Sequence, residues 1–170
     1  MAASGQAIAS DRFLRIYMND QLAAGVLWRE VAQRAQRNNA GTELGDALAR
    51  VATGIAEDVA TFEQLMDRLG FPRSRVKSSV AVAAERVGRL KLNGRLRTYS
   101  PLSRFAELDF LAIGIDGKKI LWVNLGDLAG LRARLPDVDF DGLIERAQRQ
   151  RAEIEPFRLE AGRQAFGSRA

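Results

Sequence analysis

The stretch from Thr42 to Gly70, TELGDALARVATGIAEDVATFEQLMDRLG, has the most regular hydrophobic pattern in this 170-residue chain. Its apolar residues recur every three or four positions without a gap, which places them on one face of an α-helix. Thr42 is suited to cap the start of that helix, and Gly70 followed by Pro72 is suited to end it. The apolar face is made of Leu44, Leu48, Val51, Ile55, Val59, Phe62, Met66 and Leu69.

Three further long helices are expected around this one. The first runs from a cap at residue 10 or 11 to residue 38, another from about 100 to 131, and the last from 140 to 166. A helix of about 27 to 30 residues is roughly 40 to 45 Å long, so the four helices match in length. Pro156 is expected to kink or split the last one, because proline removes a hydrogen bond from a helix interior.

These lengths and the short turns predict an all-α fold of four long antiparallel helices, arranged as two helical hairpins. A shorter helix is expected within the crossover between the two pairs, residues 73–100. We therefore expect a flexible tail at 1–9, a single helical-bundle domain at 10–166 and a frayed end at 167–170.

The crossover is strongly basic. Residues 68–104 hold ten lysines and arginines and a single acid, which gives that stretch a formal charge of +9, whereas the rest of the chain carries −4. Asn93-Gly94 within it is typical of a β-hairpin turn. A hairpin there would place like charges opposite each other, and an isolated hairpin is only marginally stable in water. We prefer a helix end followed by a loop, with the hairpin as the alternative.

Composition excludes several kinds of chemistry. The chain has no cysteine and no histidine, so disulfides, thiolate metal sites and imidazole catalysis are all ruled out. It contains no phosphate-binding glycine loop and no nucleophile motif. No catalytic residue, metal or cofactor is therefore predicted. Residues 1–10 do not have the pattern of a signal peptide, and no apolar run reaches the length expected of a membrane span. A cytoplasmic protein with no membrane partner is therefore expected.

The layout of two helical hairpins joined by a long crossover resembles the ferritin-like superfamily. Members of that family bind a metal pair through Glu residues on two helices and Glu-x-x-His motifs on the other two. Here every glutamate that could begin the motif lacks the histidine three positions later. The resemblance therefore implies the fold but neither the di-iron site nor ferroxidase activity. The residues in the histidine slots are Ala60, Met66, Phe110, Gln148, Pro156 and Arg163.

A second resemblance covers two shorter stretches. Arg89-Leu-Lys-Leu-Asn-Gly-Arg-Leu96 and Tyr99-Ser-Pro-Leu-Ser-Arg-Phe-Ala-Glu-Leu108 are similar to uncharacterised helical proteins of actinobacteria. This resemblance implies no particular activity.

Acidic residues of the helix at 100–131 form one candidate site. Asp109, Asp116 and Asp127 are separated by 7 and 11 residues and so lie along one line of a helix, with Glu107 near its start. A buried cluster of these carboxylates could hold a hard cation through oxygen ligands, which gives a carboxylate-only metal protein as one alternative. They could equally accept arginines of the basic crossover or form a solvated edge.

Residues 61–97 offer a second candidate site. A helix, the turn at Phe71-Pro72-Arg73 and a second helix resemble a helix-turn-helix, with residues 90–97 as a wing. In such units the start of the second helix contacts bases, and each phosphate contact adds salt-dependent affinity. The alternative is the junction of a helix C-cap with the next N-cap. The candidate contacts to nucleic acid or another anion are Arg73, Arg75, Lys77, Arg86, Arg89, Lys91, Arg95 and Arg97.

The leading hypothesis from sequence is a non-enzymatic helical-bundle protein without a metal centre that binds another macromolecule. A nucleic acid or an acidic protein fits the basic crossover, and a DNA-binding regulator is the main alternative. The helix at 100–131 is apolar on nearly all sides. Such a helix is normally covered on more than one side, so a homodimer through it is also expected.

Overall fold

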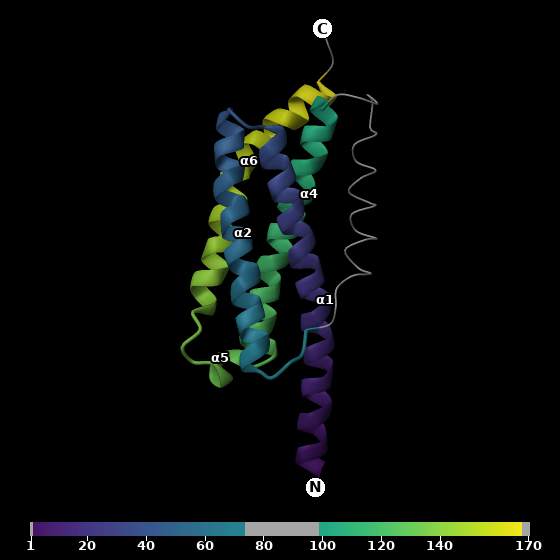
Figure 1. Ribbon diagram of the computed structural model, residues 1–170, viewed down its shortest axis with the longest axis vertical. Coiled ribbons are helices and arrows are strands. Elements are labelled where there is room, and N and C mark those ends of the chain that lie inside the picture. Colours follow the sequence, from purple (N-terminus) through teal and green to yellow (C-terminus); the bar gives the residue numbers. More distant parts are fainter. Residues whose placement is uncertain (1, 74–98, 168–170) are drawn as a thin grey trace.

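The computed structural model describes residues 2–73 and 99–167, and within these ranges it contains helices and no strands. The all-α prediction is confirmed for this part of the chain. Four of its helices are long, as expected, and two short helical segments join the last two long ones (Figure 1). The elements are α1 (Ala2–Asn38), α2 (Glu43–Arg68), α4 (Pro101–Val123), the π-helix η2 (Asn124–Leu128), α5 (Leu131–Arg134) and α6 (Phe140–Phe166).

Helix α2 begins and ends as its sequence predicts. The Thr42 side chain accepts a hydrogen bond from the Gly45 N–H, which satisfies one of the free donors at the helix start. At the other end Gly70 has a φ of +68°, a left-handed conformation that glycine adopts without strain. The N–H groups of Gly70 and Phe71 bond back to the carbonyls of Asp67 and Met66, the two bonds of a Schellman motif. The helix is continuous between these ends.

Helix α1 begins at Ala2 rather than at Ser10 or Asp11. Helical backbone therefore extends through most of the segment 1–9, which the sequence predicted as a tail. The prediction relied on Ser10 and Asp11 as capping residues, but alanine and glutamine upstream also support helix. Figure 1 shows this end of α1 projecting beyond the other helices.

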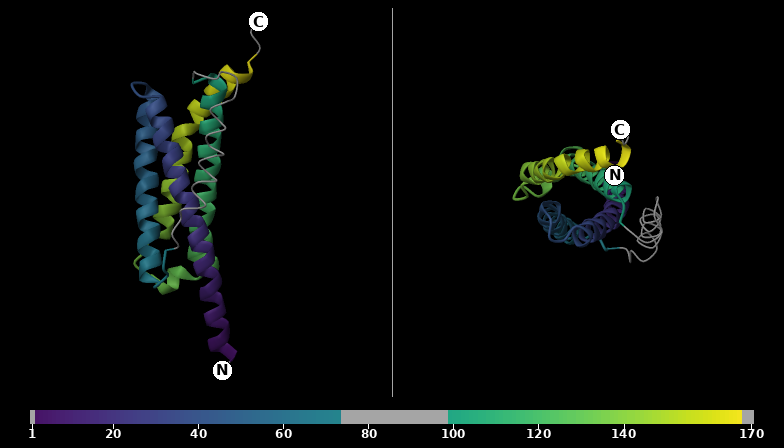
Figure 2. Two further views of the ribbon diagram at one scale, coloured as in Figure 1. Left: turned by 45° about the vertical axis from the view of Figure 1, so that its right-hand side comes forward. Right: turned by 90° about the horizontal axis from the view of Figure 1, so that it is seen from above.

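The long helices pack in two pairs. Helix α1 packs along α2 and α4 packs along α6, whereas contacts between the pairs, α1 with α4 and α2 with α6, are fewer. Viewed along the long axis, the α1–α2 pair faces the α4–α6 pair (Figure 2). Each pair runs antiparallel, as short connections require.

The helix predicted at 100–131 is interrupted near its end. Ser100 caps α4 by accepting the Ser103 N–H, and Pro101 lies in the first turn, both as expected. After Val123 the backbone widens into η2, and Gly130, with a φ of +66°, separates it from α5. Because a π-helix and a left-handed glycine redirect the chain, α5 turns across the end of the molecule toward α6 (Figure 1).

Helix α6 begins at the predicted cap, since the Asp139 side chain accepts a hydrogen bond from the Gly142 N–H. Pro156 lies inside the helix, which continues to Phe166 and is therefore not split. Figure 1 shows the last turns of α6 leaning away from its first part, in keeping with the expected kink.

The buried residues form two clusters along the length of the molecule. One is centred on Leu48, Leu111 and Ile154, and the other on Met66, Trp122 and Phe140, all of which are essentially inaccessible to solvent. The apolar face predicted for α2 supplies residues to both clusters. Within the described residues, no helix is both long and apolar enough to cross a membrane.

Candidate functional site

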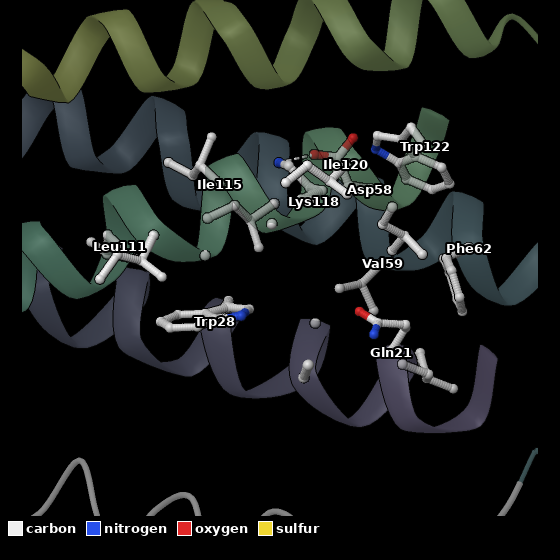
Figure 3. A pocket seen from close by; sticks show the side chains of 18 of the residues that line it. Gln21, Trp28, Asp58, Val59, Phe62, Leu111, Ile115, Lys118, Ile120 and Trp122 are labelled. Carbon is white, nitrogen blue, oxygen red and sulfur yellow. Dashed lines mark hydrogen bonds and ion pairs between the residues drawn. The ribbon is translucent and has the colours of Figure 1, made fainter. Parts of the chain in front are cut away.

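A pocket lies between α1 and α4, with α2 behind it (Figure 3). Its volume is about 360 Å³, at the lower end of the range for small-molecule sites. Most of its lining is apolar. Aliphatic side chains of α2 and α4 form much of the wall, together with four aromatic side chains: Tyr17, Trp28, Phe62 and Trp122.

One end of the pocket depends on a glycine. A β-carbon placed on Gly114 of α4 would lie only 2.4 to 2.8 Å from three atoms of the Trp28 indole. The missing side chain therefore lets the indole lie directly against the α4 backbone. Phe110, one turn earlier, holds the indole from another side, with the ring centroids 4.0 Å apart. Trp28 is thus fixed as the end wall.

A polar cluster forms the wall of the pocket nearest α6. Asp58 of α2 is 2% exposed, and its carboxylate contacts the Lys118 ammonium of α4. Lys118 also donates to the Gln150 side-chain carbonyl of α6. The second Asp58 oxygen accepts from the Arg146 guanidinium at 3.2 Å. Three helices are therefore joined by one buried network.

Burial is the largest effect on Lys118, and it lowers the pKa of the ammonium below 10.5 despite the neighbouring Asp58 carboxylate. Asp58 opposes this effect, whereas the positive charge of Arg146 reinforces it. Asp58 and Lys118 are the two side chains in the described lining that are of an acidic or basic residue, and their charges are opposite. The pocket wall is therefore close to electrically neutral.

Gln21 contributes a different kind of polar group. Figure 3 shows its side chain reaching from α1 toward the space between α1 and α4. Among the described residues its amide has no hydrogen-bond partner. Tyr17 also lines the pocket, but its hydroxyl accepts from Asn124 at 3.3 Å. The Trp122 Nε1 is buried without a described partner, and Figure 3 shows it on the side of Asp58.

The acidic residues predicted as a cluster do not form one. Glu107 is buried, but it pairs with Arg34 at 2.7 Å and also accepts from Asn38. Asp109 and Asp116, both substantially exposed, pair with arginines of α6, and Asp127 pairs with Arg132 of α5. One interpretation from sequence expected arginines of the basic crossover to pair with these carboxylates. The arginines that pair with them among the described residues belong to α5 and α6 instead. In the described ranges no three acidic residues gather as a metal site would require.

Most of the basic candidates lie outside the described residues. Arg75, Lys77, Arg86, Arg89, Lys91, Arg95 and Arg97 all fall there, as do the crossover helix and the hairpin alternative. Arg73 is described, and its guanidinium lies 3.3 Å from Asp67 and 3.5 Å from Glu63 of α2. Arg73 therefore already contacts two acidic residues of its own chain. Binding of nucleic acid by the other basic candidates stays a prediction.

Sequence reasoning missed the polar cluster, although a signal was present. Asp58 lies between Ile55 and Phe62 on the apolar face of α2, and Gln150 lies between Ala147 and Ile154 on that of α6. A polar residue on an otherwise apolar face needs a buried partner. Lys118 supplies it, but nothing in the sequence pairs these three residues.

No family model, curated protein or solved structure matches this chain.

Proposed function

We propose that this chain is a non-enzymatic binding protein that takes up a small, mostly apolar molecule between α1 and α4. The observation that carries the proposal is the pocket of about 360 Å³, lined by four aromatic side chains and by the ion pair of Asp58 and Lys118 at one side. Sites for small molecules are typically concave, mostly apolar and supplied with few polar groups.

The polar cluster supports binding rather than catalysis. A catalytic acid, base or nucleophile needs a free lone pair or proton within reach of a substrate. Here the Asp58 carboxylate accepts from Lys118 and Arg146, and the Lys118 ammonium donates to Asp58 and Gln150. Because each group is engaged with another, the cluster serves to hold three helices in register around the pocket.

Tryptophan fluorescence tests the proposal directly, because both tryptophans of the chain line the pocket. A panel of uncharged apolar probes that do not absorb with tryptophan, such as 1-decanol, should shift the emission and saturate. Ala24→Leu adds bulk to the pocket lining and should lower the affinity for the probes, so that saturation needs a higher concentration. Ala60→Leu, on the exposed side of α2, should leave the affinity unchanged. Unchanged emission throughout the panel up to the solubility limit of each probe would remove the proposal.

The ferritin-like arrangement belongs to the same proposal. The pairing of α1 with α2 and of α4 with α6, and the long connection from Leu69 to Ser100, support it. The absence of cysteine offers a clean test. A short bis-maleimide should link cysteines placed at Arg50 and Glu153, which form an ion pair between α2 and α6. Failure to link this pair in the folded protein would contradict the arrangement.

A macromolecular partner is a second candidate, and exposed apolar residues favour it. On α4 the side chains of Ile113 and Ile120 are 60% and 57% exposed, seven positions apart on one helix face. A second copy packing on that face would give the homodimer expected from sequence. Sedimentation should then show a dimer at micromolar concentration that Ile120→Lys dissociates, and a wild-type monomer would exclude it. A cytoplasmic location and a nucleic-acid or acidic protein partner remain predictions from composition and charge.

A further inference from the structure

We infer, on the basis of the proposed binding function, that the ligand is uncharged. We further infer that it carries one group that both donates and accepts a hydrogen bond, such as a hydroxyl or an amide. Gln21 would recognise that group, while the aromatic walls hold the apolar remainder.

The charges around the pocket favour an uncharged ligand. Lys118 and Asp58 compensate each other, and the remaining charge near them, the Arg146 guanidinium, contacts both Glu57 and Asp58 at 3.2 Å. No charged group of the described lining is left for a ligand to pair with. Moving an ion out of water without a counter-charge is strongly unfavourable. A carboxylate or an ammonium should therefore be rejected.

The Gln21 amide determines the polar part of the ligand. A primary amide has two N–H donors and one carbonyl acceptor, so it matches a group with both functions. Gln21 is half-buried, points into the pocket and has no partner among the residues that the structure describes. Of the other polar groups nearby, Tyr17 bonds Asn124, and Lys118 bonds Asp58 and Gln150. The Trp122 Nε1 has no described partner, but it is buried and can only donate.

The walls determine the apolar part. Trp28 closes one end against Gly114, and Phe62 and Trp122 lie toward the other end (Figure 3). A volume of about 360 Å³ is near the lower end of the range for ligand sites, which favours a small ligand. Flat aromatic walls pack well against flat rings. A compact molecule of one or two rings therefore fits better than a long chain.

Equilibrium dialysis with three probes of one shape tests this inference: 2-naphthol, naphthalene and 2-naphthoate at neutral pH. We expect 2-naphthol to bind about three- to tenfold more tightly than naphthalene, the usual gain from one hydrogen bond. Binding of 2-naphthoate should be weaker than that of 2-naphthol by about 100-fold or more, because its charge finds no partner.

Two variants identify the groups responsible. Gln21→Met keeps the length of the side chain but removes the amide, so it should abolish the preference for 2-naphthol over naphthalene. Gln33→Met is the matched control on α1, since Gln33 is also half-buried but does not line the pocket. Asp58→Asn leaves the Lys118 ammonium without a facing carboxylate, whereas Arg146 keeps Glu57, so the variant should raise the affinity for 2-naphthoate at least tenfold.

The outcomes separate the inference from the function on which it rests. If 2-naphthoate binds wild type as tightly as 2-naphthol, or if Gln21→Met leaves the preference intact, the inference is overturned and the binding function stands. If none of the three probes binds, and uncharged apolar probes leave the tryptophan emission unchanged, the proposed function itself fails.

Discussion

The Lys118 ammonium and the Asp58 carboxylate contact each other inside the molecule, with side chains only 13% and 3% exposed. Asp58 belongs to α2 and Lys118 to α4, so the pair connects the two helical hairpins. Gln150 of α6 accepts from Lys118 and completes the link. Apolar packing alone permits helices to slide by a turn, whereas a buried ion pair has one favourable register. This contact therefore aligns the helices that enclose the pocket.

Removing Asp58 should destabilise the fold more than removing Lys118. Asp58→Ala leaves Lys118 with Gln150 and near the positive Arg146, and a stranded buried charge costs about 3 to 5 kcal/mol. Lys118→Met should cost less, because Asp58 keeps its contact with Arg146. Urea unfolding followed by circular dichroism measures both. Arg68→Ala, which breaks an exposed pair with Asp137, is the control and should change the stability far less than either variant of the buried pair. Equal losses for all three variants would contradict this role for the pair.

Two glycines of α4 should respond in opposite ways to alanine. Gly114→Ala puts a methyl group into the Trp28 indole and should destabilise the protein by about 1 to 3 kcal/mol through overpacking. Gly117→Ala meets nothing within 4 Å and should stabilise by about 0.5 to 1 kcal/mol, because alanine favours helix. Thermal unfolding gives the sign of each change. The Trp28 emission should shift only in the first variant, and a neutral Gly114→Ala would show that the indole is not held there.

The helices could be predicted from sequence because their signals are local. Thr42, Ser100 and Asp139 each cap the helix that follows, and Gly70 ends α2 in the left-handed conformation expected of it. The interruption at η2 could not be predicted, because Asn124 to Leu128 continues the same apolar pattern as α4. Only tertiary packing distinguishes a π-helix from an α-helix in such a segment.

The candidate site was harder to predict because it depends on contacts between distant residues. Asp58 and Lys118 are 60 positions apart, and Gln150 is 32 further on. The acids that sequence analysis selected instead, such as Asp109 and Asp116, share one helix line but pair outward with Arg158 and Arg151. Spacing within a helix indicates which residues share a face. It does not indicate what faces them across the interior.

Tyr99 should make stability fall in alkaline solution. Burial raises the pKa of its phenol well above the usual 10, so the folded chain keeps a proton that the unfolded chain releases. Stability is therefore full below pH 10 and declines as the pH rises above it. Tyr99→Phe removes the hydrogen bond from Asn39, so the variant should be about 1 kcal/mol less stable at neutral pH. Its stability should then decrease less steeply than that of wild type as the pH rises.

Urea midpoints of the two proteins at a series of alkaline pH values test this prediction. Lys118 acts in the opposite direction there, because burial lowers its pKa, so the comparison must be between paired variants. Parallel curves for wild type and Tyr99→Phe would show that the phenol titrates alike in both states.

Glu155 should make stability fall in acid. Hydrogen bonds from Arg158, and further contact with Arg151, lower the pKa of this carboxyl from 4.5 to about 2. Its contribution is fully present above pH 4.5 and is lost as the pH falls toward 2, because the unfolded chain takes up the proton first. Glu155→Gln should therefore flatten the acid limb of stability against pH, measured by urea unfolding. Glu145→Gln changes an exposed pair with Arg149 on the same helix and should leave that limb unchanged. If both variants flatten it equally, general charge rather than the Arg158 contact sets the acid sensitivity.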